Sequence, residues 1–294
     1  MRIQVLGSAA GGGVPQWNCY CLNCRTARSG EAPQLRRTQS SVVVSADGQR
    51  WVLLNASPDL TNQFASCPVF RQDKGKIRNS PIEAVALTDG EMDHVAGLFS
   101  LREQKTLQVI SGGPVKDLIS KQFPVLPVLA RYCKIKHSTF PVTIAGFRIS
   151  SLEFGGDKAP RYAGRRGRRG DVVGLKLETR QGKSFVYIPG LPSINNDVDR
   201  FVSGCDCLMV DGTFWSEGEM KSMRLTNRTA REMGHIPISG ESGTLAWLAG
   251  LDVRRKIYTH INNTNPVLRA TSIERKKVER SGLEISYDGM SIKL

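Results

Sequence analysis

The sequence predicts an α/β protein in which helices cover β-sheets, and three observations support that class. Short apolar runs with strand character are mixed with candidate helices along the whole chain of 294 residues. The composition, 40% hydrophobic and 23% charged, is typical of a folded globular protein and excludes a disordered, collagen-like or bare coiled-coil chain. No apolar stretch approaches the roughly 20 residues that a membrane-spanning helix needs.

The predicted elements follow one another without an internal repeat of solenoid period. Strands are predicted at 3–6, 41–44, 51–55, 84–88, 108–111, 172–178, 184–188, 207–211, 256–260 and 283–287. Helices are predicted at 57–64, 94–104, 114–122, 197–201, 243–251 and 265–282. Ser57, Pro58 and Asp59 form a typical helix start, with an N-cap hydroxyl, a proline in the first turn and a carboxylate near the positive end.

The charge of the chain predicts an anionic partner. Lysine and arginine outnumber aspartate and glutamate by 41 to 27, which gives a net charge of +14. Nucleic acid, a membrane face and a small acidic substrate all fit such an excess. The chain has no recognition helix, zinc-finger module or RNA-binding signature, so we expect no nucleic-acid partner. Residues 1–7 are typical of a strand and not of a signal peptide, so we expect a soluble, cytoplasmic protein with no membrane partner.

A basic segment at 155–171 interrupts the pattern of strands. Charges of one sign at this density cannot pack into a core, so the segment is predicted to be a surface loop. Its candidate substrate-binding residues are Arg161, Arg165, Arg166, Arg168 and Arg169. One interpretation is a solvated insertion. The other is a basic lid whose guanidinium groups bind substrate carboxylates in a bidentate manner, and the sequence does not decide between the two.

Three of the seven cysteines, Cys19, Cys21 and Cys24, lie within six residues of one another. The odd number and the tight clustering argue against a secreted disulfide framework and for a metal site in a reducing compartment. Three thiols on a tight turn can converge on one zinc ion, which takes four ligands tetrahedrally. The alternative is a set of buried, unpaired cysteines. We favour structural zinc, for which the sequence does not name the fourth ligand.

A second cluster of ligand-type residues follows the predicted strand at 84–88. Asp89, Glu91, Asp93 and His94 lie in a loop that leads into an apolar helix. Carboxylates and an imidazole at the end of a strand are a concentration of oxygen and nitrogen ligands. The alternative is that Asp93 caps the helix while the other carboxylates are solvated. Two distant strands favour the metal site, because they end at Asp211 and at His260.

These residues resemble the ligand motifs of the metallo-β-lactamase superfamily. Asp-x-Glu-x-Asp-His at 89–94 is similar to the superfamily's His-x-His-x-Asp-His, and Asp211 and His260 match its later bridging aspartate and last histidine. The resemblance implies an αββα sandwich, with two mixed central sheets and helices outside, as a single domain over residues 1–294. The cysteine cluster resembles the structural zinc site of the phosphodiesterase branch.

The differences from the superfamily motif favour one active-site metal ion over two. Hydrolases of this fold hold a first metal through two early histidines, and Asp89 and Glu91 occupy those positions here. The second ligand set is retained as Asp93, His94 and His260. Two imidazoles and one carboxylate with open positions are the ligands of a non-haem iron(II) oxygenase. Two metals bridged by hydroxide would be the hydrolytic arrangement.

In this interpretation the remaining acidic residues are not among the three main metal ligands. Asp211 is expected either to complete the ligand shell or to orient a bound water. Asp89 and Glu91 are expected to support ligands or to handle protons as catalytic groups.

Longer motifs are similar to a family of this superfamily that takes part in pyrroloquinoline quinone (PQQ) biosynthesis. They are Trp-Asn-Cys-Tyr-Cys-Leu-Asn-Cys at 17–24, Ser-Pro-Asp-Leu at 57–60, Asp-Gly-Thr-Phe-Trp at 211–215, Met-Gly-His-Ile-Pro-Ile-Ser-Gly at 233–240 and His-Ile-Asn-Asn-Thr-Asn-Pro at 260–266. The resemblance implies an iron(II)- and O2-dependent hydroxylase. Its substrate would be the small, acidic glutamate–tyrosine diamino acid, hydroxylated on the tyrosine-derived ring. Other proteins of the PQQ pathway and a second copy of the chain, in a homodimer, are candidate partners.

Two further residues are assigned by the same resemblance. His235 matches a catalytic-acid position of the phosphodiesterase branch, and an imidazole that titrates near neutrality suits a proton donor. Its alternative role is a hydrogen bond to the backbone. In that branch a histidine three residues beyond the last ligand completes the zinc shell. This position is Asn263 here, so Asn263 could approach the cysteine site.

Two other functions remain open at this stage. One is a metal-dependent hydrolase, which would require two zinc ions in the active site. The other is a non-catalytic carrier that binds the acidic quinone PQQ through the arginines of the loop. Metal content separates the hydroxylase from the hydrolase, and oxygen consumption separates an oxygenase from a carrier.

Overall fold

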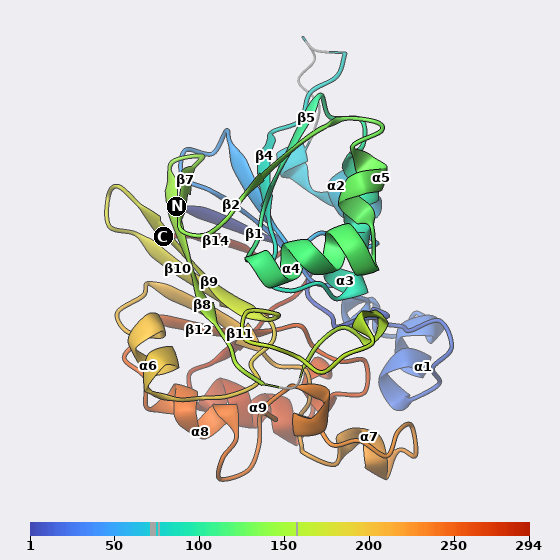
Figure 1. Cartoon of the computed structure of the whole chain (residues 1–294). Coiled ribbons are helices and arrows are strands. Elements are labelled where there is room, and N and C mark those ends of the chain that lie inside the picture. The colour runs from blue at the N-terminus through green and yellow to red at the C-terminus, as the bar shows by residue number, and fades with distance from the viewer. Residues whose placement is uncertain (71–74, 76, 157) are drawn as a thin grey trace.

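The chain folds into two β-sheets that lie face to face, with helices on the outer face of each (Figure 1). The computed structural model describes residues 1–70, 75, 77–156 and 158–294. Within these residues each sheet contains seven strands, and each combines antiparallel with parallel neighbours. This is the αββα sandwich that the sequence predicts, so the predicted fold class is confirmed.

The first sheet joins the early strands to the last one in the order β14-β1-β2-β3-β4-β5-β6. Its strands are β1 (Arg2–Gly7), β2 (Ser41–Ser45), β3 (Trp51–Leu54), β4 (Ile82–Ala86), β5 (Thr106–Ile110), β6 (Lys134–Ser138) and β14 (Ser291–Lys293). Neighbours from β14 to β3 are antiparallel, and neighbours from β3 to β6 are parallel. Because β1 pairs with β14, the two ends of the chain lie close together (Figure 1).

The second sheet has the order β13-β12-β11-β10-β9-β8-β7. Its strands are β7 (Val142–Ile144), β8 (Phe147–Glu153), β9 (Val173–Thr179), β10 (Ser184–Ile188), β11 (Cys207–Asp211), β12 (Arg255–Thr259) and β13 (Glu284–Ile285). Neighbours from β7 to β10 are antiparallel, and neighbours from β10 to β13 are parallel. Each half of the sandwich therefore carries a parallel block of strands, whose carboxyl ends share one edge.

Short helices cover the two outer faces. The α-helices are α1 (Leu22–Ser29), α2 (Leu60–Ser66), α3 (Met92–Val95), α4 (Gly113–Asp117), α5 (Val125–Leu129), α6 (Asn196–Val202), α7 (Glu219–Ser222), α8 (Thr244–Ala249) and α9 (Ile273–Arg280). Single 3₁₀ or π segments are η1 (Pro33–Leu35), η2 (Pro68–Phe70), η3 (Ala96–Leu101), η4 (Leu118–Gln122), η5 (Arg161–Ala163), η6 (Arg231–Met233) and η7 (Pro266–Leu268). No helix of the described chain is long and apolar enough to cross a membrane.

Three apolar layers hold the sandwich together, and strand β2 shows how the sequence builds them. Val42 and Val44 belong to the cluster between the sheets, whereas Val43 belongs to the cluster beneath α2 to α5. Side chains alternate between the two faces of a strand, so a run of three valines fits a strand that is covered on both faces. The third layer packs the second sheet against α6, α8 and α9.

Most predicted elements are present, but the helix predicted at 57–64 begins three residues later than expected. Helix α2 starts at Leu60, and the carboxylate of Asp59 does not cap it. Instead that carboxylate accepts hydrogen bonds from the backbone N–H of Gln39 at 2.9 Å and from its side-chain amide at 3.0 Å. A tertiary contact therefore replaces the predicted local one. The helix predicted at 265–282 is likewise divided, into η7 and α9.

Candidate metal centre

The predicted ligands come from three strand ends that meet between the two sheets. Asp89 lies in the loop that follows β4, and Asp93 and His94 lie in the short helix α3 directly after it. Strand β11 ends at Asp211, and His260 directly follows β12. Ligands commonly gather at the carboxyl ends of parallel strands, and this site follows that rule across two sheets. His260 has a φ of +57°, a left-handed conformation that costs a non-glycine residue about 1–3 kcal/mol. Such strain is typical of functional sites.

Asp93, His94 and His260 present their ligand atoms to one point. Nε2 of His260 lies 3.3 Å from Oδ2 of Asp93, and Nε2 of His94 lies 3.9 Å from the same oxygen. The three ligand atoms lie within 4.8 Å of one another. Nε2 of His94 is buried and has no hydrogen-bond partner in the described chain. Because an unpartnered buried nitrogen is costly, this atom fits a role as metal ligand, and the donor set fits a divalent transition metal.

Asp89 lies behind His94 and fixes its orientation. Nδ1 of His94 is 2.8 Å from both carboxylate oxygens of Asp89. The hydroxyl of Thr88 and the backbone N–H of Glu91 donate to the same carboxylate at 2.8 and 2.9 Å. In the neutral form of His94, which is the form that binds a metal, the proton is therefore assigned to Nδ1, and the lone pair of Nε2 is left for the metal. Asp89 contacts Nδ1 of His94 and not Nε2, and its predicted role in ligand support or proton handling stays a prediction.

The charges in this cluster shift the pKa values of its members. Burial alone lowers the pKa of His94, but the carboxylates of Asp89 and Asp93 raise it to about 9. Burial would raise the pKa of Asp89, yet the imidazole of His94 holds it at about 2. The pKa of Asp93 likewise stays well below its usual range, because the nearby imidazoles outweigh burial. In the metal-free protein the three residues thus form a compact group of alternating charge.

Thr213 orients the ring of His260 through Nδ1, as Asp89 orients the ring of His94. Its hydroxyl is 2.8 Å from Nδ1 of His260 and 2.6 Å from Oδ1 of Asp211. The arrangement that satisfies both contacts has the hydroxyl donating to the carboxylate and accepting from the imidazole N–H. Nε2 of His260 faces Asp93, and in this tautomer of the neutral ring its lone pair is available to a metal. Neither Thr213 nor Thr88 is among the predicted site residues, and in the sequence they are marked only by their proximity to Asp211 and Asp89.

Asp211 and His235 form a second network next to the first. Oδ2 of Asp211 lies 2.6 Å from Nδ1 of His235 and accepts the backbone N–H of Leu191 at 3.0 Å. Nε2 of His235 lies 3.0 Å from Nζ of Lys158, a residue that the sequence analysis did not select as a site residue. The ring of His235 stacks on His260, with 5.6 Å between centroids. Both nitrogens of His235 and both oxygens of Asp211 therefore have partners.

The environment of His235 keeps its imidazole neutral. Burial lowers its pKa to about 4, and the ammonium of Lys158 adds to that effect while Asp211 opposes it. At neutral pH the N–H of Nδ1 donates to Asp211 and Nε2 accepts from Lys158. Glu91 is half-buried nearby, and burial raises its pKa although the charge of Lys158 counteracts the rise. The catalytic roles predicted for His235 and Glu91 stay predictions.

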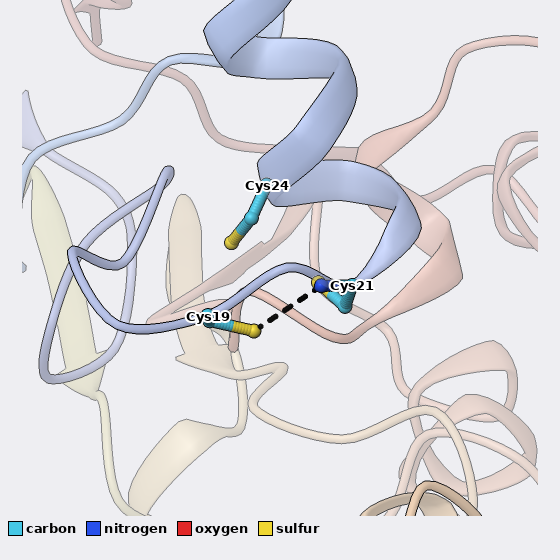
Figure 2. Close-up of side chains that lie close together, drawn as sticks. All are labelled: Cys19, Cys21 and Cys24. Carbon is cyan, nitrogen blue, oxygen red and sulfur yellow. Dashed lines mark hydrogen bonds between the residues drawn. The ribbon is translucent and has the colours of Figure 1, made fainter.

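The cysteine cluster lies at the start of α1, and α1 and α7 lie on the same side of the molecule (Figure 1). Cys24 is on the first turn of the helix, while Cys19 and Cys21 are on the loop before it (Figure 2). The three thiols lie within 4.8 Å of one another, and the backbone N–H of Cys21 approaches the Cys19 sulfur at 3.5 Å. The three thiols therefore converge, as predicted from the sequence. The binding of a zinc ion by these thiols stays a prediction.

Asn263 is the side chain that reaches all three thiols. Its Nδ2 lies 3.0 Å from the sulfur of Cys19, 3.7 Å from that of Cys21 and 3.3 Å from that of Cys24. The hydrogen bond from Cys21, together with the Asn263 amide, lowers the pKa of the Cys24 thiol to about 7. A thiolate is the form that binds zinc. Asn263 either donates to such thiolates or, after rotation of its amide, offers Oδ1 as the fourth ligand.

The basic loop lies against the metal centre, but most of its arginines already have carboxylate partners. Arg165 binds the buried carboxylate of Asp171 through two contacts of 2.6 and 2.8 Å. Arg168 pairs with Asp117 at 3.2 Å, and Arg169 pairs with Glu153 at 3.5 Å. Arg161 and Arg166 are exposed and form no ion pair in the described part of the chain. The substrate-binding role predicted for the five arginines stays a prediction.

Comparisons with known proteins place this geometry in a family. Residues 50–261 match the family model described as "Beta-lactamase superfamily domain". The chain is 43% identical to coenzyme PQQ synthesis protein B of Methylococcus capsulatus and 40% identical to that of Pseudomonas aeruginosa, with full coverage of both chains in each case. It belongs to the coenzyme PQQ synthesis protein B family, a branch of the beta-lactamase superfamily.

Solved structures agree with this family assignment. The Zn²⁺-bound PqqB from Methylobacterium extorquens superimposes with a TM-score of 0.92 at 38% identity, and the match covers 100% of both chains. A diphosphatase of the PhnP family has a TM-score of 0.70 at 18% identity, with coverage of 100% of this chain and 97% of the other, and shows the fold alone. The PqqB structure is described as zinc-bound, so metal binding occurs within the family.

Proposed function

We propose that this protein acts in PQQ synthesis as an iron(II)- and O2-dependent hydroxylase. Its substrate is the glutamate–tyrosine diamino acid, and the reaction adds hydroxyl groups to the tyrosine-derived ring. The convergence of Asp93, His94 and His260 on one point is the observation that carries the proposal, because two imidazoles and a carboxylate are the ligands of iron(II) oxygenases. The membership of the chain in a family named for PQQ synthesis supports the pathway.

The residues of the chain divide the work in this proposal. Asp93, His94 and His260 hold the iron, which supplies the capacity to bind and activate O2. Asp89 and Thr213 keep the two imidazoles in the tautomer that presents Nε2. Both imidazoles are buried, so that water is largely excluded from His94, which is 2% exposed.

A hydrolase is the second candidate, because Asp211, His235 and His260 also lie within 4.8 Å of one another. Two observations weigh against a metal there. The ammonium of Lys158 already lies 3.0 Å from Nε2 of His235, and a cation at that nitrogen would repel it. Both carboxylate oxygens of Asp211 are already hydrogen-bonded, to Leu191, Thr213 and His235. One active-site metal, and not a hydrolytic pair, therefore fits the residues best.

The decisive experiment combines metal analysis with oxygen consumption. The protein is isolated without added metal, loaded with iron(II) under argon, mixed with the diamino acid and then exposed to O2. We expect product whose mass has risen by one oxygen atom for each hydroxyl added. If both atoms of O2 enter the ring, no reductant is needed. If one atom leaves as water, two electrons per turnover must come from an added reductant.

The alternatives give other results in the same experiment. Two zinc ions in the active site and turnover without O2 would identify a hydrolase. Binding of PQQ with no change of substrate mass and no oxygen uptake would identify a carrier. The cysteine cluster is expected to retain one zinc ion in all cases, because its ligands are separate from the active-site residues.

A further inference from the structure

Lys158 belongs to the basic loop, but its side chain enters the metal centre. Its Nζ lies 3.0 Å from Nε2 of His235. The absence of a side chain at Gly234 leaves the space that Lys158 fills, because a Cβ there would lie 2.2 Å from its Cδ. A side chain larger than hydrogen at Gly234 would therefore displace the lysine.

The ammonium of Lys158 has no carboxylate partner among the described residues. The guanidinium groups of Arg165, Arg168 and Arg169, in contrast, each pair with a carboxylate. It nevertheless stands close enough to the metal centre to influence the acidic residues of the 89–94 loop. A lysine ammonium carries three N–H donors, and Nε2 of His235 accepts only one. Among the described residues no second acceptor is bonded to this ammonium, so two of its donors are available to a molecule that enters the site.

Three contacts of described residues attach the loop that carries Lys158 to the rest of the protein. The backbone N–H of Phe154 donates to Val172 at 3.0 Å and closes the base of the loop. The hydroxyl of Tyr162 donates to the carbonyl of Gly90, which ties the loop to the 89–94 motif. The Arg165–Asp171 pair adds a third attachment, with Asp171 fully buried. A preorganised cation of this kind suits recognition of a negative group.

We propose that Lys158 is a substrate-binding residue that holds an oxyanion of the substrate beside the metal centre. The inference rests on the proposed function for the identity of that substrate. Asp89, Glu91 and Asp93 concentrate negative charge in the site, so an anionic substrate needs an opposing cation to enter it. The oxyanion is either the ring phenolate or a carboxylate of the amino-acid portion, since both bind an ammonium through charge-assisted hydrogen bonds.

Binding to the zinc-loaded protein without O2 tests the proposal independently of turnover. The probes are 4-nitrophenol, whose phenolate has its own absorption band, and glutarate, which carries only carboxylates. At slightly acidic pH we expect the wild-type protein to bind 4-nitrophenol as the phenolate or to bind glutarate, measured by absorbance and calorimetry. Lys158→Met should weaken that binding about ten-fold or more, the loss of one charge-assisted hydrogen bond. Lys158→Arg should restore most of it.

Matched variants separate recognition from folding. Lys121→Met removes an exposed lysine that pairs with Asp117 and should leave probe binding unchanged. Gly234→Ala should displace Lys158 and weaken binding, whereas Gly164→Ala introduces alanine at a similar positive φ with no atom nearby and should not. Melting temperature and zinc content are measured for each variant.

The two probes identify the source of the oxyanion. Dependence on Lys158 for 4-nitrophenol alone assigns the ring oxygen, and dependence for glutarate alone assigns a carboxylate. Equal affinities of wild type and Lys158→Met for both probes, or no binding of either probe by the wild type, would overturn the proposal. Failure of the iron-loaded protein to hydroxylate the diamino acid, with Lys158-dependent probe binding intact, would overturn the proposed function alone.

Discussion

The cysteine cluster and the Asp93–His94–His260 centre are built in opposite ways. Cys19, Cys21 and Cys24 come from one turn of chain at the start of α1, and two of the three are partly exposed. The centre instead combines a loop of the first sheet with the end of β12 in the second sheet, and both of its imidazoles are buried. The first site can form locally, whereas the second exists only when both sheets have packed.

One loop nevertheless joins the two sites. His260 belongs to the centre, and Asn263, three residues later, reaches the cysteine thiols. Asn23 of α1 donates to the backbone carbonyls of Asn263 and Asn265, each at 2.9 Å. Through this loop the cysteine site can support the position of His260 without taking part in chemistry. Metal loss should therefore have different consequences at the two sites.

Removal of an imidazole from the centre should have the largest effect on function. We expect His94→Ala and His260→Ala each to abolish turnover, because the two remaining ligands hold a divalent ion poorly. Elemental analysis should show loss of the active-site metal and retention of cysteine-bound zinc. His137→Ala is a matched control, since this half-buried histidine on β6 bonds to Ser111 away from the centre. Simultaneous loss of both metals would contradict the separation of the two sites.

The pH dependence of metal uptake should be the next largest effect. The folded-state pKa of His94 is raised to about 9, so a proton competes with the metal below that pH. Apparent affinity should rise roughly 50-fold between pH 7 and pH 9 and then level off. The raised pKa also stabilises the apoprotein below the unfolded value of about 6.5, and this contribution is lost as the pH rises toward 9. Competition with a chelating dye measures the affinity, and a flat profile would contradict the assignment.

Asp89→Asn should show how strongly metal affinity depends on the hydrogen bond between Asp89 and His94. The amide keeps the shape of the carboxylate but loses the charge that holds the proton on Nδ1 of His94. Loss of such a supporting partner typically costs 10–100-fold in metal affinity. The rise of affinity with pH should also flatten, because the variant no longer raises the pKa of His94 as strongly. Asp117→Asn, an exposed carboxylate on α4, serves as the control.

The ligands of this site could be predicted from the sequence, but the contacts that support them could not. The ligand residues could be predicted because their types and their place at strand ends limit the chemistry to a few options. Thr213, Lys158 and the contact of Asp59 with Gln39 could not, because each depends on which distant segments come together. The edge strand β6 was missed for a related reason. Lys134 and Lys136 give it little apolar character, and it is paired on one side only.

Loss of the cysteine-bound metal should affect stability more than chemistry. Cys24→Ser removes the thiol whose pKa is lowered to about 7 and should release one zinc ion per chain. We expect a lower melting temperature, and a few-fold loss of turnover because the loop that holds His260 loses its attachment to α1. Cys67→Ser replaces a cysteine of the outer core far from the cluster and should retain zinc. Turnover as low as in His260→Ala would instead assign the cluster a direct part in the reaction.

The exposed arginines of the basic loop should give the smallest effect. Arg161 and Arg166 are the two predicted substrate-binding arginines without an ion pair in the described chain, so they are the ones available to a substrate carboxylate. The contribution of an exposed pair is about 0.2–1 kcal/mol, so Arg161→Ala and Arg166→Ala should each raise KM no more than about five-fold and leave kcat unchanged. High salt should reduce the difference. Arg254→Ala, which removes an exposed arginine outside the loop, controls for net charge. If the KM values of both loop variants equal that of the control, the loop is a solvated frame and substrate recognition belongs to groups inside the site.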